Sequence, residues 1–445
     1  MTSPCPLNAP RTEDRLSALK SLAVSHRKPA SSAGPREVNC HVHTFYSFSP
    51  YSPSAAAERA QAAGLAAVGI MDHDSIGGAA EMREAGSILG IATTAGVELR
   101  VSAAGTALEG RKTNNPDSLG VMYIIIHGVP SRSVARVQEF LRPIQAAREL
   151  RGRRMVERLN GLLPSLGLHP LDWQRDVRSW SRADDGGTIT ERHILHAVAR
   201  AIVEKAGRGR PLLESLEKTI GIHPPGRVAD YLADPSNDML LFDLLGVLKS
   251  SFIEKIYIQP DAAECVPVRD AVIFFEGVGA IPAYGYLGDV TDSPTGDKKA
   301  ESFEDSYLDE LMAEVKRLGF RAIAYMPPRN TIAQLLRVQQ LCARHGFMEI
   351  SGVDINSPRQ SFNCPELALP EFSHLVSATW ALVAHERLSD DGLHWGLFHP
   401  ENPLAAEPLA RRIAAYAELG RSLDPSDPRP AAEHPLARSW EKSAR

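Results

Sequence analysis

Short apolar runs recur along the first third of the chain, and helical segments separate them. Four of these runs predict buried strands: 38–43, 65–71, 91–101 and 121–127. Two segments between them have the end signals of helices: 54–63 and 79–89. Because strand, helix and strand in succession form a βαβ unit, the pattern predicts an α/β fold with a parallel sheet or barrel.

The alternation stops at about residue 131 and returns near residue 268. Helical periodicity dominates the stretch between these points, over 134–160, 190–205, 212–219 and 235–254. Three later runs predict further strands: 280–284, 321–326 and 349–354. We therefore expect five parts: a disordered leader over 1–35, the first part of a barrel over 36–130, a helical insertion over 131–268, the second part of the barrel over 269–400, and a C-terminal helix with a Pro-rich tail over 401–445.

Composition narrows the class of protein. The 445 residues are 43% hydrophobic and 23% charged, with a net charge of −5, which disfavours a nonspecific nucleic-acid binder. The most apolar run, 121–126, is too short to cross a bilayer. The five cysteines are scattered and form no C-x-x-C pair, and the N-terminus has no signal-peptide pattern. We expect a cytoplasmic protein without a membrane partner.

Two histidines stand two residues apart in the first predicted strand. Side chains of a strand alternate between its faces, so His41 and His43 point the same way. Neutral imidazole is the commonest metal ligand among side chains, so the pair is a candidate metal site. The alternative for this motif alone is an inward-facing pair satisfied by hydrogen bonds.

Further polar residues stand at the ends of later predicted strands: His73, Glu98, His127 and Asp354. In parallel α/β folds the carboxyl ends of the strands share one face, where active sites are built. Imidazole and carboxylate without thiolate suit zinc, manganese or iron(II). Each residue also has a structural alternative: an ion pair with Arg100 for Glu98, packing for His127, and turn or cap roles for 72–74 and Asp354.

The order of these motifs resembles a known family. His-Val-His-Thr-x-x-Ser at 41–47, Met-Asp-His-Asp-Ser at 71–75, Gly-Val-Glu at 96–98 and then a strand-end histidine are similar to the polymerase-and-histidinol-phosphatase (PHP) family of metal-dependent phosphoesterases. The likeness is strongest over 37–130, and returns more weakly at 190–193 and 351–356. It implies a distorted (β/α)7 barrel, similar to a TIM barrel, with one to three divalent metal ions.

The resemblance also implies roles for individual residues. His41 and His43 would bind one metal that Asp354 completes, Glu98 would bridge two metals, and the remaining ions would use further histidines: His73, His127 and His193. Three positions depart from the family pattern, namely Phe48, Tyr284 and Asn356, where the family has metal ligands. Asn356 would be a weak, neutral oxygen ligand.

Candidate substrate-binding residues lie beside these motifs. Three arginines are placed to hold a phosphate group: Arg100, Arg192 and Arg329. Tyr284 is a candidate hydrogen-bonding partner of the substrate, and the loop around 295–299 is a candidate lid. Surface ion pairs are the alternative for each arginine, and packing is the alternative for the tyrosine.

The function that these observations favour is hydrolysis of a phosphomonoester or phosphodiester by metal-bound hydroxide. We expect the substrate to be a small phosphorylated molecule or a short nucleotide, and the only nucleic-acid partner to be a short oligonucleotide. The alternatives are a non-catalytic PHP-like protein that binds metal or ligand in a degenerate site, and a metal-dependent hydrolase of amide bonds.

Overall fold

The computed structural model describes residues 5–25, 37–115, 118–289 and 303–444. One sheet contains the strands of this part of the chain: β1 (Val38–Val42), β2 (Ala67–His73), β3 (Ala92–Ser102), β4 (Val121–His127), β5 (Val266–Pro267), β6 (Ile281–Gly285), β7 (Ala322–Tyr325) and β8 (Met348–Ser351). Seven of them are hydrogen-bonded in the order β1-β2-β3-β4-β6-β7-β8, and β5 pairs with the end of β3.

Strand β4 runs against both of its neighbours. It pairs antiparallel with β3 and with β6, whereas the other pairs along the main path are parallel. The described residues of the connection between β3 and β4 form no helix, whereas a parallel crossover normally needs one, and the two strands pair antiparallel. The prediction that His127 ends its strand on the same face as the other candidate ligands was therefore wrong, because the C-terminal end of β4 faces the other end of the sheet.

The sheet curls until its two edges meet. Beyond β8, Ile355 forms a parallel bridge with Val42 of β1. The backbone amide of His43 donates to the carbonyl of Ile355 at 2.9 Å, and the amide of Ile355 donates to the carbonyl of His41 at 3.1 Å. The predicted barrel is thus present in distorted form, with one reversed strand and a single bridge at its closure.

Helices pack on the outer face of the barrel. They are α2 (Pro53–Ala62), α3 (Ala79–Leu89), α9 (Val268–Gly277), α10 (Leu308–Arg317) and α11 (Ile332–His345). Their apolar faces share one hydrophobic core with strand residues such as Ile70, Leu99 and Ile323. Each apolar run predicted as a strand is buried on both sides because the interior of the barrel is also filled.

Helix α12 (Ser373–Asp391) packs against the inner face of the sheet. It shares a second apolar core with Cys40, Met71 and Ile125, and with helices α13 (Leu409–Ser422) and α14 (Pro435–Ala444). The sequence pattern did not predict α12, because its buried side chains include the polar Thr379, His385, Glu386 and Ser389. The C-terminal part predicted as a tail instead ends in α14, whose Trp440 stacks on Tyr416 at 5.1 Å.

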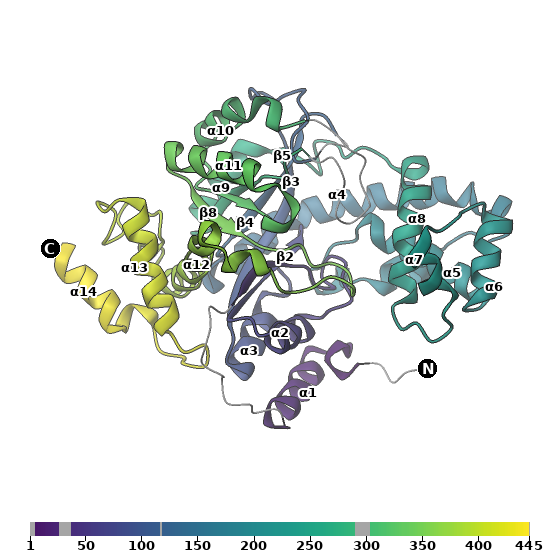
Figure 1. Ribbon diagram of the computed structural model, residues 1–445, viewed down its shortest axis with the longest axis horizontal. Helices are drawn as coiled ribbons and strands as arrows, with labels where there is room; N and C mark the ends of the chain where they lie inside the picture. The colour runs from purple at the N-terminus through teal and green to yellow at the C-terminus, as the bar shows by residue number, and fades with distance from the viewer. Residues whose placement is uncertain (1–4, 26–36, 116–117, 290–302, 445) are drawn as a thin grey trace.

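The predicted disordered leader also differs from the structure. Residues Thr12–Ser25 form α1, which packs on α2 and α3 at the foot of the barrel in Figure 1. Leu19 is fully buried there, and Arg15 makes a buried ion pair with Glu81 of α3 at 2.5 Å. Polar composition concealed this helix because one arginine provides much of its attachment.

The insertion consists of α4 (Val134–Asn160), α5 (Glu191–Ala206), α6 (Arg210–Ser215), α7 (Gly226–Ala233) and α8 (Leu240–Ile256). These helices surround a hydrophobic core of their own. Figure 1 shows α4 extending from the barrel into this group. The candidate lid at 295–299 lies outside the described residues. None of the helices in the described ranges combines the length and apolarity needed to cross a membrane.

The buried Glu386 of α12 predicts a pH dependence of stability. Its carboxylate accepts a hydrogen bond from the amide of Ala95 at 2.9 Å and pairs with Arg83 at 3.0 Å. Burial raises the pKa of Glu386 to about 7, although Arg83 opposes the shift. Because an unfolded glutamate has a pKa of about 4.3, its contribution to stability is fully present at about pH 4 and is lost as the pH rises to about 7.

The variant Glu386→Gln isolates this contribution. We expect the difference in unfolding free energy, wild type minus variant, to fall by about 3 kcal/mol between about pH 4 and about pH 8. Chemical denaturation of both proteins across this range measures the difference. A difference that stays constant with pH would contradict the assignment of the shift to Glu386.

Candidate metal centre

Three histidine rings converge on one carboxylate oxygen inside the barrel mouth. Nε2 of His41 and Nε2 of His43 each lie 3.5 Å from Oε2 of Glu98. Nδ1 of His73 lies 3.3 Å from the same oxygen. The in-register pairing of β2 with β3 sets His73 opposite Glu98. His41 in β1 and His43 just after it both point toward the same carboxylate.

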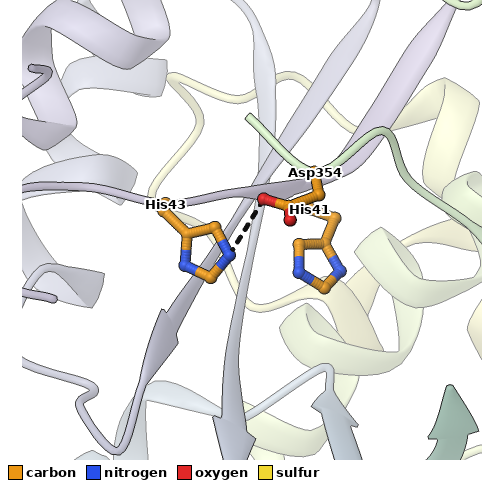
Figure 2. A group of neighbouring side chains, drawn as sticks. All are labelled: His41, His43 and Asp354. Atoms are coloured by element: carbon orange, nitrogen blue, oxygen red, sulfur yellow. Dashed lines mark ion pairs between the residues drawn. The ribbon is translucent and has the colours of Figure 1, made fainter. Parts of the chain in front are cut away.

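Asp354 brings a second carboxylate to the opposite side of His43. Its Oδ1 lies 3.2 Å from Nε2 of His43, and Figure 2 shows this contact with His41 beside it. Two groups of candidate ligand atoms result, each spanning no more than 4.8 Å: His41, His43 and Asp354, and His43, His73 and Glu98. The two groups share His43.

The segment that carries Asp354 is held directly against β1. The side-chain amide of Asn39 donates to the carbonyl of Val353 at 3.0 Å, and its oxygen accepts from the amide of Val353 at 3.0 Å. Gly352 passes so close that a Cβ there would lie 2.5 Å from Cβ of His41. A side chain at 352 would therefore push Asp354 away from the histidines.

A buried hydrogen-bond network supports His43 from behind. Asp72 is fully buried and accepts bonds of 2.6 Å from the amide of Thr44, the hydroxyl of Thr44 and the hydroxyl of Ser47. The Ser47 hydroxyl lies 3.5 Å from Nδ1 of His43. Asp72, Ser47 and Asn39 were not predicted as site residues, and the only available signal was their place beside the histidine motifs.

Asn356 also acts behind a candidate ligand. Its side-chain amide donates to Oδ1 of Asp354 at 2.7 Å, the oxygen that faces His43. The structure thus places Asn356 as a group that orients Asp354.

The electrostatics of the site leave both carboxylates and His73 ready to bind a cation. His43 differs: although burial opposes the shift, Asp354 and Glu98 raise its pKa. Although burial opposes the shift, His73 and His41 lower the pKa of Glu98 to about 2. Burial also opposes the shift at Asp354, but His43 and His41 outweigh burial and hold the pKa of Asp354 far below its usual range. Burial lowers the pKa of His73 to about 3. At neutral pH both carboxylates are ionised and His73 offers a lone pair.

Two ring nitrogens of the site are left without a hydrogen bond in the described structure. Nε2 of His43 and Nδ1 of His73 are buried and find no hydrogen-bond partner. Buried polar atoms are rarely unsatisfied, so such atoms need an explanation. A divalent ion fits this donor set of imidazoles and carboxylates, and it would satisfy both nitrogens.

His127 is buried near the site, but on a strand that runs antiparallel to its neighbours. It lies two residues beyond Ile125, which pairs with Glu98 across β3 and β4. Burial, assisted by the nearby His41, lowers the pKa of His127 to about 3, and its Nε2 has no hydrogen-bond partner among the described residues. It is not part of either ligand group, so its role in metal binding stays a prediction.

His193 is occupied locally. Its Nδ1 accepts a hydrogen bond of 3.0 Å from the amide of Thr190, as part of the cap at the start of α5. Its ring meets the edge of Phe48 at 4.9 Å between centroids. Thr190 is the N-cap of α5, and the structure does not bring His193 into either ligand group.

Two of the predicted substrate-binding residues are used elsewhere. Arg100 is buried and pairs with Glu264 at 2.9 Å and with Glu191 at 3.3 Å. Tyr284 is fully buried in the outer core, and its hydroxyl donates to Glu304 at 2.6 Å. Both side chains have partners that are distant in the sequence, and a role of either in substrate binding stays a prediction.

The other two predicted residues lie nearer the surface. Nε of Arg329 donates to the carbonyl of Leu287 at 3.2 Å, in a turn that follows β7. Arg192 is partly exposed at the start of α5, and its charge helps to lower the pKa of Asp354. Arg192 is therefore the predicted arginine that the structure places beside the candidate metal centre.

Part of the chain that carries the site is similar to a known protein family. Residues 39–149 match the PHP domain family model. This part of the chain is similar to the PHP domain. The matched segment includes four candidate ligands, His41, His43, His73 and Glu98, while Asp354 lies outside it. The distorted α/β barrel is consistent with a PHP-type barrel.

Two solved structures are similar over most of the chain. One is a "putative metal-dependent phosphoesterase" from Bifidobacterium adolescentis, with 20% identity and a TM-score of 0.48, covering 75% of this chain and 93% of that one. The other is an amidohydrolase from Chromobacterium violaceum with bound sulfate and no metal, with 18% identity and a TM-score of 0.48, covering 76% and 95%. A search of curated proteins finds no significant match.

Proposed function

We propose that this protein is a metal-dependent phosphoesterase that hydrolyses a phosphomonoester or phosphodiester of a small molecule or short nucleotide. The observation that supports the proposal most is the convergence of three imidazoles on Oε2 of Glu98, with Asp354 on the far side of His43. The PHP domain match over 39–149 supports the same class of reaction.

The imidazole and carboxylate ligands determine which chemistry a bound ion would contribute. A divalent cation in such a site lowers the pKa of a bound water and offsets negative charge on a phosphoryl group. His41, His43 and Asp354 would hold an ion as one group, and Glu98 with His73 would hold one as the other. Asn356, Ser47 and Asp72 keep these ligands oriented before any ion binds.

Arg192 supplies the positive charge that a phosphate ester requires. A guanidinium can donate two parallel hydrogen bonds to phosphate oxygens, and its charge persists at all physiological pH values. No described residue forms a hydrogen bond or ion pair with Arg192. We therefore assign it to binding the phosphoryl group, with zinc, manganese or iron as the metal.

The test combines metal content with a panel of substrates. Purified protein, supplied in turn with Zn²⁺, Mn²⁺ and Fe²⁺, is analysed by elemental analysis and assayed on phosphomonoesters, short oligonucleotides and amides. We expect at least one ion per chain, lost in the His41→Ala, His43→Ala double variant, together with hydrolysis of phosphate esters. Bound metal with activity on amides alone would overturn the proposal. Bound metal with no hydrolysis at all would favour a non-catalytic PHP-like protein.

A further inference from the structure

The turn after β2 connects the candidate ligand His73 to the helical insertion. The residue after His73 is Asp74, whose φ is 48°. It is the only non-glycine residue with a positive φ among the described residues. An L-residue rarely adopts this conformation unless its surroundings fix it. The amide of Asp74 donates to the carbonyl of Glu98 at 2.9 Å, so the turn is tied to the strand of the other candidate ligand.

Helix α4 holds this turn by two side chains one helical turn apart. Arg148 pairs through Nη1 with the buried carboxylate of Asp74, and Gln145 donates to the carbonyl of Asp74 at 2.8 Å. Arg148 and Asp74 are almost fully buried. Both backbone and side chain of the strained residue are therefore fixed from the insertion.

The same arginine reaches the start of α5. Nη2 of Arg148 donates to Oε2 of Glu191 at 2.9 Å, next to Arg192 in the chain. Glu191 also accepts from Arg151 at 2.6 Å and pairs with Arg100 at 3.3 Å. Glu191 thus keeps two partners if Arg148 is replaced, whereas Asp74 loses its ion pair.

We infer that Arg148 is a positioning residue, which fixes His73 for metal binding by clamping Asp74 in its left-handed conformation. The inference rests on the proposed function and extends it, because it makes the helical insertion part of the metal centre. Arg148 touches neither ligand group directly, so its effect must pass through the 73–74 turn. Partners behind a metal ligand typically contribute 10- to 100-fold in affinity, and we expect Arg148 to act in this range.

The experiment measures Mn²⁺ binding to the full-length protein by isothermal titration calorimetry, with metal content checked by elemental analysis. Arg148→Gln is expected to weaken binding about 10- to 100-fold. The same substitution in a His73→Ala background is expected to have less than about a twofold effect, because the ligand that it positions is already absent. A general loss of structure would weaken binding equally in both backgrounds.

Two further variants guard against misfolding and against nonspecific charge effects. Gln145→Ala removes the hydrogen bonds to the carbonyls of Asp74 and Gly186. We expect a loss of affinity of about 2- to 10-fold that also disappears in the His73→Ala background. Arg142→Gln changes an exposed arginine of the same helix and should bind Mn²⁺ as the wild type does.

The outcomes separate the two proposals. If wild type binds Mn²⁺ and Arg148→Gln binds it equally well, or loses affinity regardless of His73, the positioning role is overturned while the proposed function stands. If wild type binds no Mn²⁺, Zn²⁺ or Fe²⁺, the proposed function fails, and the positioning role fails with it.

Discussion

Replacement of Glu98 by glutamine is expected to reduce phosphate-ester hydrolysis by more than about 100-fold, which exceeds the usual effect of groups behind the ligands. The substitution keeps the shape of the side chain but removes the charge on which the three imidazoles converge. It also replaces one carboxylate oxygen by an NH2 group, which cannot bind a cation. Metal content, measured by elemental analysis after dialysis, should fall together with the rate.

A matched control for this variant is Glu157→Gln. Glu157 lies on the exposed face of α4, and the same change of charge there should leave both metal content and rate at the wild-type level. Thermal unfolding of both variants checks that the barrel persists. Retention of metal and of hydrolysis in folded Glu98→Gln protein would rule out the proposed centre.

Replacement of Arg15 by methionine is expected to destabilise the docking of α1 by about 3–5 kcal/mol, because it leaves a buried carboxylate without its partner. Arg15 donates to both oxygens of Glu81, at 2.9 and 2.5 Å, and also to the carbonyls of Ala9 and Pro10. Glu81 in turn accepts from the hydroxyl of Ser54 at 2.7 Å, so one ion pair joins α1, α2 and α3.

Native-state hydrogen exchange measures this effect locally. Amides of α1 should exchange much faster in Arg15→Met, while amides of the barrel strands keep most of their protection. Lys20→Met is the matched control, since Lys20 and Glu84 form a pair between the same two helices at 3.3 Å but are more than half exposed. Lys20→Met should destabilise the docking of α1 by less than about 1 kcal/mol. Equal effects of the two substitutions would contradict the assigned importance of burial.

The sequence was informative about the site where local rules apply. His41 and His43 face one way because strand side chains alternate, and His73 and Glu98 meet because parallel neighbours align in register. The structure brings these four residues and Asp354 together, as the strand-end argument predicted. Whether they bind metal, and how many ions, stays a prediction.

The sequence was misleading where the decisive partner is distant. Nothing near Arg100 in the chain indicates Glu264, and nothing near Tyr284 indicates that its hydroxyl will meet Glu304 from a later loop. The direction of β4 depends on a connection without a helix, which apolar periodicity does not reveal. Helix α12 escaped prediction because buried polar residues interrupt its apolar pattern.

Closure of the barrel by Ile355 has a consequence for biosynthesis. The hydrogen bonds between Asn39 and Val353 join residues 314 positions apart, and the first ligand group needs Asp354 beside His41 and His43. A ribosome-bound chain therefore carries its histidines long before it can complete that group. The group can be completed only after residue 354 has been made, so a truncated chain ending before residue 350 would carry both histidines but not the carboxylate.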